Sequence, residues 1–169
     1  IRKEFKNPTG RLPELAVRVE VISAKSMEKN VQKSINGIKD PRERAAIEEG
    51  QRTSREFLDA AKDAAGNGNY ELASSLARQA QMGFTVLSAY VATQADTTAH
   101  ADARAAYELF FNERKYSEGY NMSLKANAVH SQHIAEQAPR DIRENNKGGK
   151  ADRIKWSNVG MILAGAYFD

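Results

Sequence analysis

Apolar residues recur at intervals of three and four along most of the chain, and this spacing predicts a series of amphipathic helices. The β-branched and aromatic runs typical of strands are missing. We expect the first helix to run from about Pro13 to Ile38. Within this segment, apolar and charged residues alternate over 17–22, a pattern that is also typical of a strand. The apolar positions expected on its inward face are Leu15, Val19, Ile22, Met27, Val31, Ile35 and Ile38.

Capping residues and turns set the boundaries of the later helices. Asp40 is expected to cap the second helix, with Pro41 at the first helical position. The Thr-Ser-Arg-Glu sequence at 53–56 favours a break inside this helix, and the Gly-Asn-Gly-Asn sequence at 66–69 ends it. Further helices are expected over 70–93, 99–112 (capped near Asp96), 116–137 and 151–166. The predicted fold is all-α, an antiparallel bundle of five to six helices.

The same signals suggest how the chain is organised. Residues 1–12 contain an Asn-Pro-Thr-Gly turn and are expected to form an extended arm. Residues 13–138 then form a domain of helical hairpins. Residues 139–150, which begin with Pro139, are predicted to be a flexible basic loop, and 151–169 a C-terminal helix that packs on the bundle.

Two hairpins, 55–92 and 101–138, are similar to each other when Tyr70 is aligned with Tyr116, 46 residues later. Small residues then coincide at three positions of the second helix of each hairpin. Such residues allow two antiparallel helices to approach closely, so the repeat predicts close helix pairs. The coincident pairs are Ala73 and Gly119, Ala77 and Ser123, and Ala80 and Ala126.

The first of these hairpins carries a family resemblance. The sequence from Gly68 to Ala73, followed by Ala80, resembles the second helix of a tetratricopeptide repeat. The sequence from Lys115 to Gly119, followed by Ala126, resembles it less closely. The tetratricopeptide period is about 34 residues, so a spacing of 46 argues against a regular superhelical array. The hairpins are also similar to the Ala-rich helical domains of bacterial envelope lipoproteins. These resemblances imply a protein-binding scaffold in the periplasm or cell envelope, with a cytoplasmic location as the alternative.

The search for catalytic chemistry centres on the three histidines. His130 and His133 lie near one helix face, and His100 on a neighbouring helix is a possible third metal ligand. The His-Glu-x-x-His pattern of zinc proteases is absent, and two surface histidines are the simpler interpretation. The chain has no cysteine, no phosphate-binding Gly-rich loop and no Gly-x-Ser-x-Gly elbow. We therefore expect a non-enzymatic interaction module without a cofactor; a metal-dependent enzyme using these histidines is the alternative.

Charge and aromatic residues indicate the kind of partner. The net charge is +3 with acidic residues interleaved among the basic ones, which argues against a nucleic-acid footprint, although a nucleic-acid-associated adaptor stays an alternative. No apolar stretch is long enough to span a bilayer, and the oligomeric state stays open. The expected partner is a protein or peptide rather than a small molecule. The candidate contact residues are Tyr90, Tyr116 and Tyr120, and, for an anionic partner, Arg143, Lys147 and Lys150.

Overall fold

The computed structural model describes the backbone of residues 8–146 and the side chains of residues 12–138. This part of the chain is helical and contains no strand, which confirms the all-α prediction. The elements are α1 (Pro8–Ile35), α2 (Pro41–Gly66), α3 (Tyr70–Ala92), α4 (Thr97–Tyr107), a π-helical turn (Glu108–Asn112) and α5 (Tyr116–Asn146). None of the described helices is long and apolar enough to cross a membrane.

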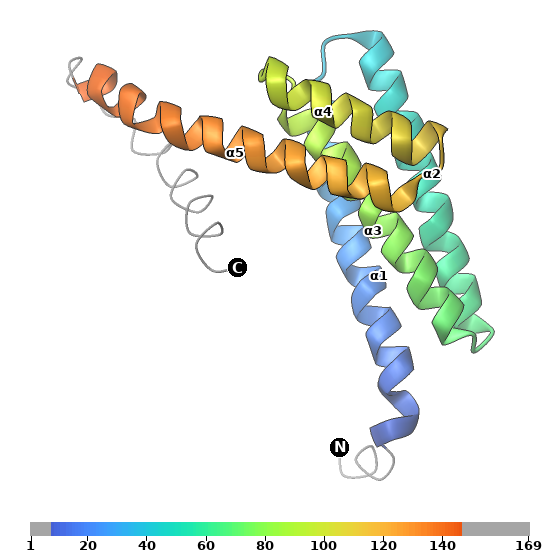
Figure 1. Ribbon diagram of the computed structural model, residues 1–169. Helices are drawn as coiled ribbons and strands as arrows, with labels where there is room; N and C mark the ends of the chain where they lie inside the picture. The colour runs from blue at the N-terminus through green and yellow to red at the C-terminus, as the bar shows by residue number, and fades with distance from the viewer. Residues whose placement is uncertain (1–7, 147–169) are drawn as a thin grey trace.

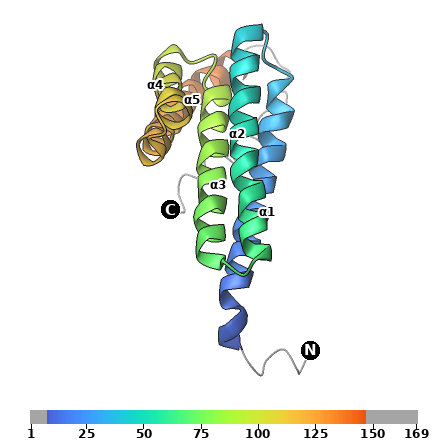
Figure 2. The ribbon, with the colours of Figure 1, turned by 90° about the vertical axis from the view of Figure 1, so that its right-hand side faces the viewer.

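The helices form two groups (Figures 1 and 2). Helices α1, α2 and α3 run alongside one another as an elongated three-helix bundle. Helices α4 and α5 form an antiparallel pair that crosses one end of this bundle at a steep angle, and the C-terminal part of α5 projects beyond it (Figure 1). Helix α3 is central, because it contacts α1, α2, α4 and α5.

Side-chain caps explain where three of the helices begin. The Asp40 carboxylate accepts a hydrogen bond from the Arg42 amide at 2.8 Å, and the Asp96 carboxylate accepts one from the Ala99 amide at 3.1 Å. Both caps were predicted from the sequence. The turn between α2 and α3 places Gly68 at a φ of 75°, a conformation that glycine adopts without steric cost, and Asn69 then caps α3. The predicted turn at 66–69 is confirmed.

The small residues that coincide in the two hairpins are buried in both, and those of α5 include a close contact with α4. Ala73, Ala77 and Ala80 of α3 are buried, and so are their counterparts on α5, Gly119, Ser123 and Ala126. A Cβ atom on Gly119 would lie 2.8 Å from the Ala106 carbonyl oxygen of α4. The α4–α5 pair therefore leaves no room for a side chain at this position.

Aromatic rings fill the space where the two groups of helices meet. Phe110 and Phe111, in the π-helical turn, lie 4.9 Å apart between ring centroids, and Phe110 also packs edge-on against Tyr116 at 5.0 Å. The Tyr107 hydroxyl donates to the Ala46 carbonyl of α2 at 2.7 Å, and burial raises the pKa of Tyr107 to about 12. Tyr107 and Phe110 are buried core residues.

Four boundary predictions are wrong. Helix α1 begins at Pro8, so residues 8–12 are helical rather than extended; Pro8 suits a first helical position as well as Pro13 does. Helix α2 has no break at 53–56, where the hydroxyl of the buried Ser54 donates to the Gly50 carbonyl at 3.0 Å. Helix α4 gives way to the π-helical turn after Tyr107.

The fourth correction concerns the predicted loop at 139–150. Helix α5 continues through Pro139 to Asn146, so 139–146 is helical. Proline removes one backbone hydrogen bond and strains the preceding turn, which ends many helices but not this one. The proposed C-terminal helix at 151–169 lies outside the described residues.

Candidate functional site

Helix α1 has apolar residues on two opposite faces, and only one of them packs against the bundle. The buried face carries Val17, Ala24, Val31 and Ile35. The predicted inward positions Leu15, Val19 and Ile22 are instead 50%, 66% and 67% exposed, so this part of the predicted core face is wrong. The pattern misled because either stripe of α1 satisfies the spacing of three and four.

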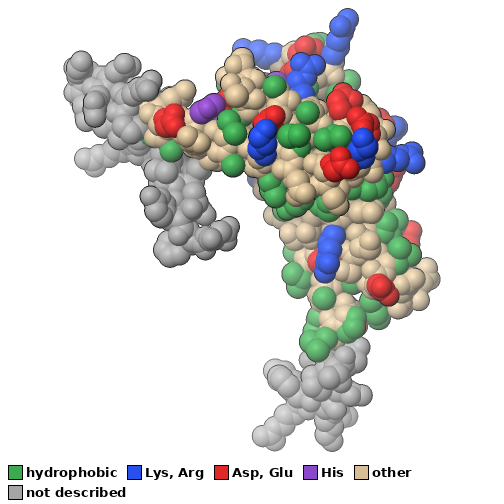
Figure 3. Space-filling view, in the orientation of Figure 1, with side chains coloured by type: hydrophobic (Ala, Val, Ile, Leu, Met, Phe, Trp, Pro, Cys, Tyr) green, Lys and Arg blue, Asp and Glu red, His purple; other side chains and the backbone are tan. Residues whose placement is uncertain are grey.

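The outward residues form a continuous strip, which we call the α1 outer stripe: Leu12, Leu15, Val19 and Ile22. Their spacing of three, four and three matches the a and d positions of a heptad, the pattern by which one helix packs along another. Large apolar side chains are normally scattered singly on a protein surface, whereas contiguous ones mark contact sites. In Figure 3, hydrophobic side chains gather at the end of the bundle nearest the N-terminus.

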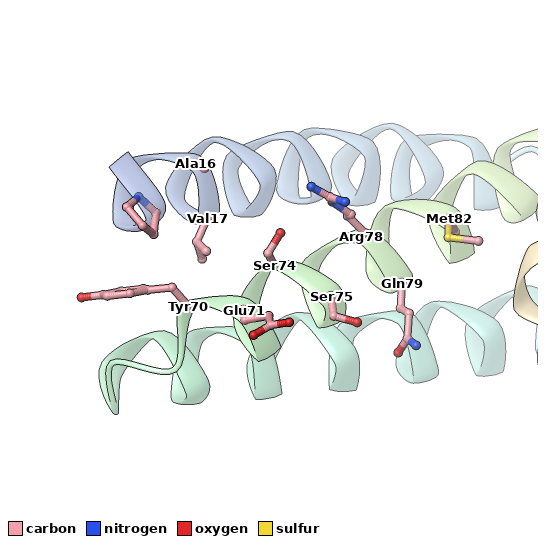
Figure 4. A pocket seen from close by; sticks show the side chains of 10 residues that line it. Ala16, Val17, Tyr70, Glu71, Ser74, Ser75, Arg78, Gln79 and Met82 are labelled. Carbon is pink, nitrogen blue, oxygen red and sulfur yellow. The ribbon is translucent and has the colours of Figure 1, made fainter. Parts of the chain in front are cut away.

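Two grooves run along the sides of α1. The first, about 590 Å³, lies between α1 and α3, with Pro13, Ala16 and Val17 facing Tyr70 and Ser74 (Figure 4). The second, about 320 Å³, lies between α1 and α2 and is lined by Val17, Arg18, Val21, Ile22, Lys62 and Ala65. Because Ile22 lines the second groove, the α1 outer stripe is continuous with it.

Polar contacts also join the inner side of α1 to α2 and α3. Arg78 of α3 donates to the Glu20 carboxylate at 2.8 Å, and Arg55 of α2 binds Glu28 at 2.6 Å. The Gln81 amide also donates to the Glu20 carbonyl at 2.8 Å. Together with the buried apolar face, these contacts orient α1 about its own axis so that the outer stripe faces away from α2 and α3.

The three histidines do not form one cluster. His130 and His133 each place Nδ1 near Asp96 Oδ2, at 3.1 and 2.8 Å. His100 has other neighbours: its Nδ1 lies 3.2 Å from the Thr93 hydroxyl and its Nε2 3.7 Å from Glu43. Within residues 12–138, no group of three His, Asp or Glu side chains is arranged to hold a metal ion.

Asp96 instead joins α4 to α5. Its carboxylate caps α4 through the Ala99 amide and accepts hydrogen bonds from His130 and His133 of α5. These hydrogen bonds, the one from the Ala99 amide foremost, lower the pKa of Asp96 to about 2. A hollow of about 350 Å³ lies beside the cluster, lined in part by Thr97, Thr98, Ile134 and Gln137.

The lowered pKa of Asp96 predicts a pH-dependent stability. A carboxyl group with a depressed folded-state pKa stabilises the fold above its unfolded pKa near 4, and this contribution is lost as the pH falls toward 2. Asp96→Asn should therefore be less stable than the wild type at pH 6, and the difference should shrink at pH 2.5. Urea unfolding at the two pH values measures it; a difference independent of pH would contradict the assignment.

The predicted aromatic contact residues occupy different environments. Tyr90 is only 5% exposed and packs edge-on against His100 and Tyr107, so the expectation of an exposed Tyr90 is wrong. Tyr116 is half-buried between Phe57 and Phe110, and Tyr120 is half-buried on α5. The backbone of Arg143 lies in α5, while its side chain, Lys147 and Lys150 lie outside the described part. The structure does not bring Tyr90, Tyr116 or Tyr120 together with the α1 outer stripe.

Comparisons with protein-family models, with curated proteins and with solved structures found no match to this chain. The tetratricopeptide and lipoprotein resemblances therefore stay predictions.

Proposed function

We propose that this protein is a non-enzymatic interaction module that binds a protein partner on the α1 outer stripe. The observation that carries this proposal is the run of four large apolar side chains, Leu12, Leu15, Val19 and Ile22, which are 50–67% exposed on a helix whose other face is already packed. Within the part of the chain that the structure describes, no packing contact requires these side chains to be apolar. Burial of these side chains beneath a partner would explain why they are apolar.

The size of the stripe indicates a weak interaction unless the partner makes further contacts. Fully burying a Val, Leu or Ile side chain gains about 1.5–3 kcal/mol. Covering four side chains that are half to two thirds exposed gains roughly 4–8 kcal/mol. Association costs about 4–15 kcal/mol in lost translational, rotational and side-chain freedom. We therefore expect the partner to use the adjoining grooves or charged residues as well.

Site-directed photo-crosslinking in native extract tests the proposal. A photoreactive side chain placed at Val19 should crosslink to a discrete protein, identified by mass spectrometry. The control is the same group at Leu124 on α5, which is 44% exposed but isolated. Adding Ile22→Asp to the Val19 probe should abolish the product, because it places a charge in the contact.

Stability serves as the second control. Ile22 is exposed, so Ile22→Asp should change the free energy of unfolding by no more than about 0.5 kcal/mol. Equal crosslinking from Val19 and Leu124, or a product that survives Ile22→Asp, would contradict the proposal.

A further inference from the structure

The two edges of the α1 outer stripe differ in charge and in size. At 3.6 residues per turn, Arg18 and Lys25 follow one edge, seven residues apart. Ala16 and Ser23 follow the other edge with the same spacing. A partner helix on this stripe would meet basic groups on one side and small side chains, which permit close approach, on the other.

Of the three acidic residues in the described part of α1, only Glu14 offsets this charge on the outside. Glu20 and Glu28 are bound by Arg78 and Arg55 on the inner side of the helix. Glu14 pairs with Arg18 at 3.1 Å, an exposed pair that a competing carboxylate can replace at little cost. Lys25 is exposed and has no ion-pair partner among the residues that the structure describes. The border of the stripe is therefore basic and open to an anionic group.

From this juxtaposition, and resting on the proposed function, we infer that the α1 outer stripe binds an amphipathic helix whose own apolar seam is flanked by Asp or Glu. The apolar a and d positions supply the contact area, and the basic edge selects partners that carry acids beside their seam. Charges of this kind set partner choice and orientation in paired helices.

A second copy of the chain satisfies the surface less well. In an antiparallel pair, residues on the same edge of the two seams face each other, so Arg18 and Lys25 would meet basic residues. In a parallel pair, they would meet Ala16 and Ser23, which carry no charge. Neither arrangement supplies a carboxylate. A lipid surface is also less well matched, because the stripe consists of only four side chains and has no Trp or Phe to anchor it in the interface.

Two designed helical peptides test the inference directly. Both carry Leu at the a and d positions of three heptads; one has Glu at every e and g position and its twin has Lys. Like charges at these positions keep each peptide from pairing with itself. Fluorescence anisotropy should show the Glu peptide binding about tenfold more tightly than the Lys peptide at low salt, with the difference shrinking in 0.5 M NaCl.

Variants of the full chain locate the effect. The double variant Arg18→Glu with Lys25→Glu should weaken binding of the Glu peptide about tenfold and improve binding of the Lys peptide. The matched control, Lys39→Glu with Arg42→Glu, makes the same change in net charge at the opposite end of α1 and should leave binding unchanged. Ile22→Asp should remove binding of both peptides.

Other outcomes would overturn the inference. These are equal affinities for the two peptides, no binding of either, or equal effects of the two charge-reversal pairs. Flotation with phosphatidylserine vesicles without peptide binding would assign the stripe to a membrane surface. A dimer in sedimentation velocity that Val19→Asp dissociates would assign it to a second copy. If the peptides fail while crosslinking from Val19 succeeds, the partner chemistry is wrong and the proposed function stands.

Discussion

Replacing Phe110 with alanine should lower the free energy of unfolding by about 3–5 kcal/mol. The Phe110 ring is completely buried where the π-helical turn meets α3 and α5, and it contacts Phe111 and Tyr116. Truncation removes the ring's buried area and leaves a cavity that the surrounding helices fill only in part. Because a domain of this size is stable by about 5–15 kcal/mol, a loss of this size is a large fraction of the total.

Urea denaturation followed by circular dichroism measures the effect. Leu124→Ala is the control, because Leu124 is 44% exposed and its truncation should change the stability by about 0.5 kcal/mol or less. A loss below about 1 kcal/mol for Phe110→Ala would mean that this ring is not part of the core.

Replacing Gly119 with alanine should also destabilise the fold, by about 1–3 kcal/mol, although it adds only one methyl group. An added Cβ would lie 2.7 Å from Phe110 Cβ and 2.8 Å from both the Phe110 amide nitrogen and the Ala106 carbonyl oxygen. Two of these three neighbours are backbone atoms, so no change of rotamer relieves the contact and α4 must move away from α5.

The comparison for Gly119 is a second helical glycine with open surroundings. A Cβ on Gly66, the last residue of α2, would meet nothing within 4 Å. Gly66→Ala should leave the stability unchanged or raise it by about 0.4–1 kcal/mol, because alanine restricts the unfolded chain more than glycine does. The same chemical change should therefore have opposite signs at the two positions, and a similar effect at both would contradict the close contact between α4 and α5.

Local sequence signals were sufficient where the physical cause is itself local. The caps at Asp40 and Asp96 and the turn at Gly68 follow from side chains that bond to, or permit, the neighbouring backbone. The small residues of the repeat, such as Ala77 and Ser123, also predicted their own burial, because only small side chains fit where helices cross closely. Helix number and type were therefore predictable.

The candidate site was not predictable, because it depends on which face of α1 packs. Val17 and Val19 are the same kind of residue two positions apart, and one is buried while the other is 66% exposed. What distinguishes them is which face of α1 meets α2 and α3, since Val17 packs with Ala64 and Ala73. The same face brings Glu20 to Arg78 of α3 and Glu28 to Arg55 of α2. Those bases lie 58 and 27 residues further along the chain, beyond the reach of periodicity. Tyr90 was misplaced for the same reason, since its burial is set by His100 and Tyr107 of α4.

The division of α1 into a packed face and a solvent face has a consequence for how this protein can change over time. Substitutions at Val19 or Ile22 alter the surface offered to a partner without touching the residues that hold the helix in place. Substitutions at Ala24 or Val31, which are buried and line neither groove, alter the packing of the helix and leave that surface unchanged. On the proposed function, recognition and folding depend on different residues of one helix, so substitutions at a few outer positions would change the partner while the scaffold stays intact.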